Sequence, residues 1–313
     1  MKIVFFGTSS FSITILEHIM GAHEVVGIVT KPDTAKGRSR ELLPPPVKEW
    51  AKHHAPLVPI YQPIKASHPE FIAFMKTIEA DIFVVASYGE IISEELLHLS
   101  PFPAINVHAS LLPRWRGASP IQRSIMAGEK ETGVTIMKMV LGLDAGDMLE
   151  AVKVPILSED DHGSLQHKLA IRAKEPLLHV LERFLKGVNF GTPQDETLVT
   201  FAPKVKSHEC LIDWKQEAFT IHNQIRALSP DVGAWTYIEI AGQKKRMKVW
   251  KSSLTTLYTL SPGEGLINQG KEWVVGCSNG ALSLEILQIE GKKSLPVAEV
   301  LRGVIQPPRI VQE

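Results

Sequence analysis

The pattern of apolar residues changes once along the chain, and this change constrains the fold more than any other feature. Up to about residue 187, short β-branched runs alternate with stretches of helical spacing. Lys2–Phe6 has the composition of a buried strand, and Phe11–Met20 places its apolar residues on one helix face. Such alternation predicts a mostly parallel sheet with helices on both faces.

The other segments of this first part continue the alternation. Leu165–Leu185 predicts one long amphipathic helix that ends at Gly187. Further strands are expected at Glu24–Thr30, Ile82–Ala86, Ala104–His108, Gly133–Met139 and Asp147–Pro155, and further helices at Pro69–Ile78 and Pro120–Ala127.

Beyond residue 187 the periodicity stops and then returns in another form. Residues 189–206 are rich in Gly, Thr, Pro and Asp and predict a linker. After a short helix at Ala218–Leu228, strand-like runs recur about every ten residues between Gly-containing turns, which is typical of a small antiparallel barrel. We therefore expect an α/β domain at 1–188, a linker at 189–206 and a β-barrel domain at 207–313.

Composition excludes several classes of protein. Hydrophobic residues make up 44% and charged residues 22% of the 313 residues, which is ordinary for a globular chain. Two cysteines, Cys210 and Cys277, without a CxxC pair argue against a disulfide scaffold or a cysteine zinc site. Met1–Gly7 runs directly into a strand pattern, without a secretory leader or a long apolar span. We expect a cytoplasmic monomer.

A net charge of zero argues against bulk electrostatic binding, but the charge is unevenly distributed. From Lys204 onward there are 14 Lys and Arg against 11 Asp and Glu, a net of +3. Strand alternation puts Arg246, Lys248 and, in a regular strand, Trp250 on one face, with Lys245 and Met247 on the other. This face is either a solvated hairpin or a strip that contacts RNA.

Two segments near the start of the chain suggest binding without defining it. The turn after the first strand has Gly7 but lacks the G-x-G-x-x-G pattern, which argues against a dinucleotide site. The loop Lys31–Arg40 is polar and basic, and Lys36, Arg38 and Arg40 could clamp a phosphate backbone. An ordinary exposed loop is the alternative.

The most informative segment surrounds Asn106 and His108. Their spacing of two puts both side chains on one face of a strand, near its carboxyl end, where open α/β sheets bind ligands. An amide N–H and an imidazole suit a carbonyl oxygen that is becoming an oxyanion. Asp144, in a turn before Ala145 and Gly146, offers a carboxylate, although an Asx-turn role would explain it equally well. No metal-binding motif is present.

These motifs together resemble one family, the 10-formyltetrahydrofolate-dependent formyltransferases, and within it the branch that acts on methionyl-tRNA. The resemblance extends over essentially the whole chain. It rests on Asn106-x-His108-x-Ser110-Leu111-Leu112-Pro113, Trp115–Ala118, Thr132–Met137, Leu143-Asp144-x-Gly146, Gln194–Thr200, Ile212-Asp213-Trp214 and the basic loop that leads to Pro46-Val47-Lys48. Ala109 and Ala145 depart from the common Gly and Thr.

The resemblance implies a Rossmann-like catalytic domain and a C-terminal barrel like an oligonucleotide-binding fold. It implies formyl transfer from 10-formyltetrahydrofolate, as co-substrate and without a metal, to the α-amine of initiator methionyl-tRNA for translation initiation. The implied catalytic residues are Asn106, His108 and Asp144. The implied folate contacts are Ser110, Leu111, Leu112 and Pro113, and the tRNA contacts expected are Lys36, Arg38, Arg40, Arg246 and Lys248.

The sequence features argue against three other functions. Formyl transfer to a small amine or to water would need neither the basic loop nor the barrel. A non-catalytic RNA-binding module would not need Asn106, His108 and Asp144 together. A nicotinamide dehydrogenase would need the missing glycine pattern.

Overall fold

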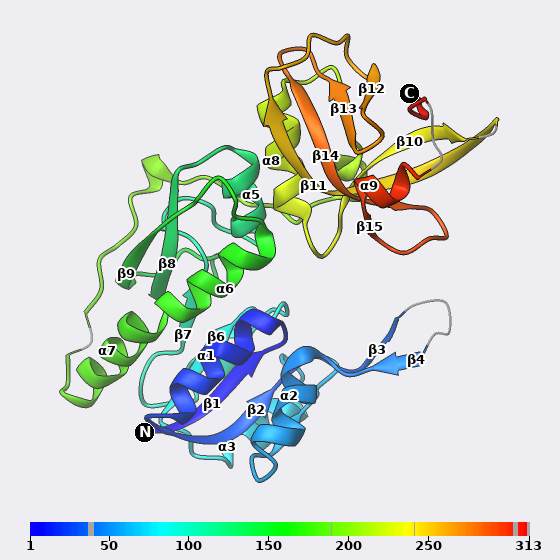
Figure 1. Ribbon diagram of the computed structural model, residues 1–313. Helices are drawn as coiled ribbons and strands as arrows, with labels where there is room; N and C mark the ends of the chain where they lie inside the picture. Colours follow the sequence, from blue (N-terminus) through cyan, green and yellow to red (C-terminus); the bar gives the residue numbers. More distant parts are fainter. Residues whose placement is uncertain (37–40, 189, 241, 303–305, 312–313) are drawn as a thin grey trace. The chain divides into compact units, whose positions relative to one another are not determined.

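The computed structural model describes residues 1–36, 41–188, 190–240, 242–302 and 306–311. The chain forms two compact units (Figure 1). Unit 1 comprises 1–120, 131–155 and 166–203, and unit 2 comprises 121–130, 156–165 and 204–313. Unit 2 therefore includes two short segments that lie between parts of unit 1 in the sequence. The domain boundaries expected at residues 188 and 207 stay a prediction.

Unit 1 is built on a seven-stranded sheet in the order β5-β2-β1-β6-β7-β8-β9. The strands are β1 (Lys2–Gly7), β2 (Glu24–Val29), β5 (Ile60–Tyr61), β6 (Ile82–Ala86), β7 (Ile105–His108), β8 (Glu131–Lys138) and β9 (Met148–Pro155). The first five pair in parallel, whereas β8 and β9 are antiparallel. This mixed sheet confirms the predicted α/β class. A separate hairpin joins β3 (Thr34–Lys36) and β4 (Glu41–Leu43).

Helices cover this sheet, and their apolar faces follow from sequence spacing. They are α1 (Ser10–Met20), α2 (Pro46–His54), α3 (Pro69–Lys76), α4 (Glu94–Leu97), α6 (His162–Arg172) and α7 (Lys174–Leu185), with a 3-10 turn at Glu196–Leu198. The prediction of one helix over Leu165–Leu185 is wrong, because α6 ends at Arg172 and α7 begins at Lys174. Pro176 explains the break: it has no N–H to donate, and its ring crowds the carbonyl of Arg172.

Unit 2 is an antiparallel sheet in the order β12-β13-β14-β11-β10-β16, with β15 beside β14. Its strands are β10 (Ala234–Ile240), β11 (Gln243–Thr255), β12 (Gly265–Asn268), β13 (Glu272–Gly276), β14 (Ala281–Ile289), β15 (Leu295–Pro296) and β16 (Arg309–Val311). Its helices are α5 (Pro120–Met126), α8 (Ala218–Leu228) and α9 (Val297–Val300), with a 3-10 turn at Ser207–Cys210. Register shifts near Lys251 bend β11, so the sheet curls into a partial barrel.

Alternation along β10 and β11 separates the core of unit 2 from its outer face. Ala234, Ile238, Met247 and Val249 are fully buried against a core that includes Trp214 and Trp273. Their neighbours in sequence, Trp235, Tyr237, Arg246 and Lys248, pair across the two strands on the opposite face. The predicted placement of Arg246 and Lys248 on one face is confirmed.

Candidate active site

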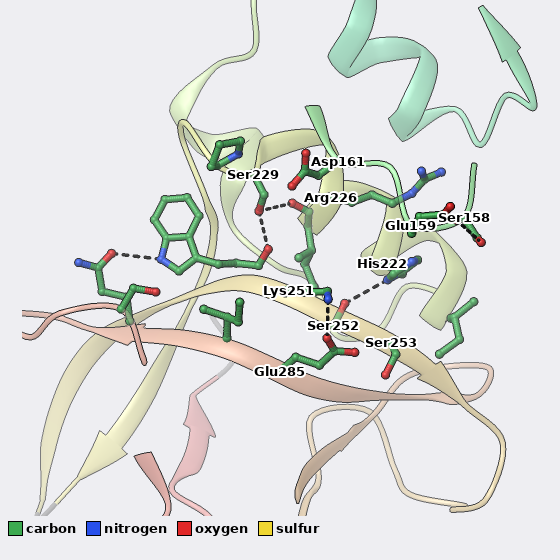
Figure 2. Close-up of a pocket in the computed structure, with 17 residues that line it drawn as sticks. Ser158, Glu159, Asp161, His222, Arg226, Ser229, Lys251, Ser252, Ser253 and Glu285 are labelled. Carbon is green, nitrogen blue, oxygen red and sulfur yellow. Dashed lines mark hydrogen bonds and ion pairs between the residues drawn. The ribbon is translucent and has the colours of Figure 1, made fainter. Parts of the chain in front are cut away.

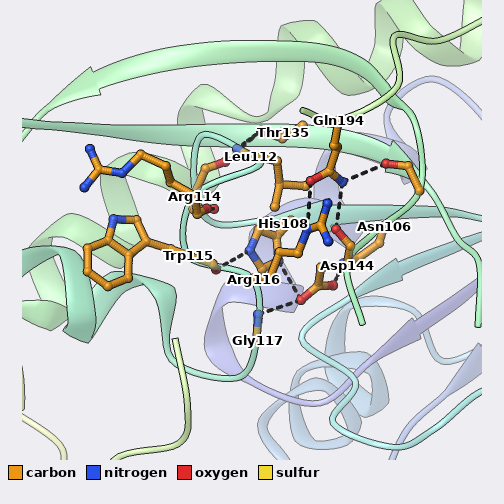
Figure 3. A network of polar contacts seen from close by, with 12 residues as sticks. Asn106, His108, Leu112, Arg114, Trp115, Arg116, Gly117, Thr135, Asp144 and Gln194 are labelled. Carbon is orange, nitrogen blue, oxygen red and sulfur yellow. Dashed lines mark hydrogen bonds and ion pairs between the residues drawn. The ribbon is translucent and has the colours of Figure 1, made fainter. Parts of the chain in front are cut away.

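Asn106 and His108 project from one face of β7, and the loop between β8 and β9 brings Asp144 to them (Figure 3). The Asn106 amide Nδ2 donates to Asp144 Oδ1 at 3.4 Å. His108 Nδ1 lies 3.6 Å from Asp144 Oδ2. The three residues that the sequence singled out, 38 positions apart at the extremes, thus form one cluster.

The backbone conformation of Asp144 and a hydrogen bond from Gly117 fix the position of its carboxylate. Its backbone has a φ of 47°, a conformation that Asp adopts more readily than most residues. Oδ2 accepts a hydrogen bond from the Gly117 backbone N–H at 2.8 Å. The side chain is about 15% exposed, so a ligand can reach the carboxylate, although it is mostly shielded.

His108 is buried, and both of its ring nitrogens face protein groups. Nε2 lies 3.0 Å from the Trp115 carbonyl oxygen. A carbonyl can only accept, so Nε2 carries a proton in this arrangement. Nδ1 faces the Asp144 carboxylate. Trp115 presents its carbonyl from a backbone with a φ of 64°, which is unusual for a bulky residue.

A second layer of polar residues, which are not among the predicted site residues, supports the Asp144 loop. Gln194 donates from Nε2 to the carbonyls of Asp144 at 2.7 Å and Gly146 at 2.8 Å. Gln194 Oε1 accepts from Arg116 Nε at 3.0 Å, and the buried Arg116 guanidinium makes a bidentate pair with Glu196. In the sequence, Arg116 and Gln194 stand out only as members of the Trp115–Ala118 and Gln194–Thr200 motifs of the family resemblance.

The predicted folate segment, Ser110–Pro113, lies beside this cluster but uses most of its polar groups internally. The fully buried Ser110 hydroxyl donates to the Arg114 carbonyl at 2.7 Å. Thr135 Oγ1 donates to the Ser110 carbonyl at 2.7 Å and accepts from the Leu112 N–H at 3.1 Å. Leu111 packs where Gly133 has no side chain, since a Cβ there would collide with it.

The predicted tRNA contacts fall into two groups. Arg38 and Arg40 lie outside the described residues, and Lys36 is the last residue of β3. In unit 2, the exposed Arg246 lies with its guanidinium 5.8 Å from the Trp235 ring centroid. Lys248 is half-buried, and its Nζ donates to the Val232 carbonyl at 2.6 Å. Arg246 is therefore the more accessible of the two cations.

Neither a metal centre nor a membrane span emerges from the described part of the chain. Within it, no group of three or more His, Cys, Asp or Glu side chains could hold a metal ion. Likewise, the described helices are too short or too polar to cross a bilayer.

Two relatives from different bacteria match nearly the whole chain. A methionyl-tRNA formyltransferase of Protochlamydia amoebophila is 42% identical over 305 residues, which cover 97% of this chain and 95% of that protein. The methionyl-tRNA formyltransferase of Dictyoglomus thermophilum is 42% identical over 311 residues, which cover 97% of each chain. In both comparisons the sequence identity is high enough, over nearly the full length, to indicate membership of one family and not merely a shared fold.

Solved structures with lower identity share the fold. HypX from Aquifex aeolicus in complex with tetrahydrofolic acid matches with a TM-score of 0.67 at 21% identity, over 96% of this chain and 47% of that one. The present chain therefore spans about half the length of HypX. The sugar 3N-formyl transferase WlaRD matches with a TM-score of 0.65 at 18% identity, over 94% and 99% of the two chains.

The family assignment follows from where the matches fall. Residues 1–181, which include the whole Asn106, His108 and Asp144 cluster, match the formyl transferase family. Residues 204–304 match the C-terminal domain of formyl transferases. With both matches in chain order and relatives at 42% identity along nearly its full length, this chain belongs to the formyl transferase family.

Proposed function

We propose that the chain transfers the formyl group of 10-formyltetrahydrofolate to the α-amine of initiator methionyl-tRNA, giving formylmethionyl-tRNA. One observation carries the proposal: Asn106, His108 and Asp144 converge in a chain whose near full-length relatives are named methionyl-tRNA formyltransferases. In this proposal the enzyme works as a monomer in the cytoplasm.

The reaction requires a neutral amine, a polarised carbonyl and a proton acceptor. An α-amine has a pKa near 8, so a useful fraction is neutral at pH 7. Its nitrogen attacks the formyl carbon and forms a tetrahedral oxyanion, to which the Asn106 amide would donate. Asp144 would take the proton that leaves the attacking nitrogen, directly or through His108 or a water. That proton is then returned to folate N10 as the C–N10 bond breaks.

His108 would stabilise the same oxyanion, but its Nε2–H already has an acceptor. The Trp115 carbonyl, at 3.0 Å, takes the hydrogen bond that the formyl oxygen would need. Substrate must therefore share that proton or displace the Trp115 carbonyl. Trp115 has a left-handed backbone, a conformation of the kind that clusters at active sites.

The folate would be held mainly by backbone groups and apolar side chains. The Ser110 hydroxyl is buried and already bonded, so Ser110–Pro113 would offer its shape and its remaining main-chain groups rather than that hydroxyl. The loop that carries Asp144 exposes three large apolar side chains, Val140, Leu141 and Leu143. Exposed apolar groups beside a polar cluster suit a planar aromatic ligand such as a pterin.

The tRNA would be held electrostatically, by Arg246 and Lys248 in unit 2 and by Lys36, Arg38 and Arg40 in the basic loop. Such phosphate contacts position a nucleic acid and carry little sequence information. In the same proposal, a domain of residues 1–188 carries out catalysis, and a domain of residues 207–313 binds the tRNA.

The test is transfer of labelled formyl from 10-formyltetrahydrofolate to three acceptors: methionyl-tRNA, glycinamide ribonucleotide and water. Label in methionyl-tRNA at a rate at least 100-fold above the other two acceptors supports the proposal, since recognition of tRNA gives that preference. Equal transfer to the small amine, or release as formate, would contradict it.

A further inference from the structure

Unit 2 contains a cavity of about 790 Å³ that the proposed formyl transfer does not use (Figure 2). Residues of β11, β14, α8 and the segment 158–161 line it. Its volume lies within the range of sites that bind small molecules or single molecular groups. It is therefore large enough for one ring system with a sugar attached.

The apolar part of the lining favours a flat ligand. Trp250, Ile225 and Ile286 contribute to the wall. The indole of Trp250 is only partly buried, and its Nε1 donates to Gln288 Oε1 at 3.2 Å, which fixes the orientation of the ring. A ring held in this way can stack a planar aromatic group with little further loss of entropy.

The polar part offers neutral hydrogen-bonding groups. Ser252, Ser253 and Ser294 line the cavity, and Figure 2 shows Ser252 and His222 facing each other from β11 and α8. His222 Nδ1 lies 3.1 Å from Ser252 Oγ. Burial lowers the pKa of His222, so its imidazole is neutral near pH 7. Hydroxyls and a neutral imidazole match the hydrogen-bonding edge of a heterocycle or the hydroxyls of a sugar.

The charges of the lining do not favour an anion inside the cavity. Arg226 already donates to the carbonyls of Asp160 and Leu157, at 2.9 and 3.2 Å. Lys251 pairs with Glu285 at 3.2 Å. Glu159 and Asp161 add two more carboxylates, so two cations face three acids. A phosphate would be better placed outside.

Cations lie just outside, on the face of β11 that Trp250 shares. Lys248 Nζ is 4.8 Å from the centroid of the Trp250 ring. Arg246, two residues further along, lies over the ring of Trp235. The aromatic rings hold these cations against the strand, which leaves less side-chain entropy to lose when a phosphate binds.

We propose that this cavity receives the base of one unpaired nucleotide in an RNA strand whose phosphates lie on Lys248 and Arg246. The inference rests on the proposed function only for the identity of the RNA. The heterocyclic base stacks on Trp250 and its edge meets the hydroxyls. The charged phosphate backbone of the RNA stays outside the acidic interior of the cavity.

The experiment measures binding of a six-nucleotide unpaired RNA and of a blunt duplex of the same sequence by fluorescence anisotropy at fixed salt. Ser294→Trp puts a bulky side chain at an exposed position of the lining and narrows the cavity. We expect it to weaken binding of the unpaired strand at least about 5-fold, the low end for loss of one base–aromatic stack. Trp250→Leu, which keeps apolar bulk but removes the aromatic ring, should act in the same direction.

Ser278→Trp, at an exposed serine outside the lining, is the matched control and should bind the strand as the unmodified chain does. Unchanged strand affinity in Ser294→Trp would overturn the inference. So would competition by adenosine or uridine monophosphate as strong as by the strand, which would assign the cavity to a free nucleotide. A chain that binds the strand in this Ser294-dependent way but does not formylate methionyl-tRNA would refute the proposed function alone.

Discussion

At the scale of single residues, Asp144 connects the parts of the candidate active site. One carboxylate oxygen receives the Asn106 amide and the other faces His108 and the Gly117 N–H. Replacing the carboxylate with an amide keeps the shape of the side chain. It removes the negative charge and the ability to accept a proton, so the substitution isolates chemistry from packing.

We predict that Asp144→Asn lowers kcat about 100-fold or more and leaves the KM for both substrates nearly unchanged, because the lost interaction develops in the transition state. Asn106→Ala and His108→Ala should have comparable effects. Steady-state kinetics of formyl transfer provide the measurement. Asp147→Asn, three residues away at a carboxylate paired with Lys138, is the control and should keep near-full turnover.

The sequence predicted only part of this geometry. Asn106 and His108 were assigned to one face because a strand alternates strictly, and the structure agrees. Asp144 could be linked to them only through family resemblance, since a turn carboxylate has no periodicity. Arg116 and Glu196 were not paired in advance, because 80 residues separate them and neither has a local signal.

At the scale of elements, the segment around Gln194 holds the Asp144 loop in place. Its amide satisfies two loop carbonyls, and Arg116 fixes the amide in turn. Without Gln194, the loop would keep the contacts of the Asp144 side chain with Asn106 and Gly117 but lose these bonds to its main chain.

We predict that Gln194→Leu lowers the free energy of unfolding by about 1–3 kcal/mol, because a buried carbonyl and a partly buried one lose their donor. It should also reduce kcat about 10-fold through misplacement of Asp144. Urea denaturation and kinetics measure the two effects. Gln243→Leu, at the exposed start of β11, serves as control; a similar loss there would attribute the effect to the substitution itself.

The pairing of Arg123 in α5 with Glu209 in the adjoining 3-10 turn makes the stability of unit 2 depend on pH. The Arg123 guanidinium and the Lys206 N–H lower the pKa of Glu209 to about 2. A carboxyl whose pKa is lowered by folding stabilises the folded state at pH values above its unfolded pKa of about 4.5, and this stabilisation is lost as the pH falls through the folded pKa of about 2. Glu209→Gln should therefore cost about 1 kcal/mol at pH 7 and markedly less at pH 2, where about half of the Glu209 carboxyls are already protonated. A cost that does not change between those pH values, in urea melts, would refute the assignment.

The outer face of β10 and β11 gives a prediction about salt. Arg246 is exposed, whereas Lys248 donates to Val232. Arg246→Ala should reduce the slope of log K for tRNA binding against log salt concentration by up to about one. Adding Lys248→Ala should reduce that slope by a smaller amount. All tRNAs should weaken alike, and turnover at saturating tRNA should survive. An unchanged slope in filter-binding assays would favour a merely solvated hairpin.

At the scale of the whole molecule, the change in periodicity predicted two architectures, but it did not predict how the chain is divided between them. Segments 121–130 and 156–165 belong to unit 2 although they lie within the stretch assigned to the first domain. Hydrophobic patterns report which face of an element is buried, not which neighbour buries it.

We predict that a fragment of residues 204–313 is less stable than the same unit in the full chain. It lacks Arg123 for Glu209 and the carbonyls of Leu157 and Asp160 for Arg226. Unfolding followed by circular dichroism should show a lower midpoint, and adding the two missing segments as a fusion should raise it. A fragment as stable as the full chain would establish 204–313 as independent.

Because unit 2 is made of three separate segments of the chain, it cannot fold completely until the last segment has been synthesised. Arg123 is synthesised 86 residues before its partner Glu209, and Asp160 is synthesised 66 residues before its partner Arg226. At about 5–20 residues per second, these segments spend several seconds in the nascent chain without their partners. The N-terminal sheet can form during that interval, whereas unit 2 can close only when synthesis is almost finished.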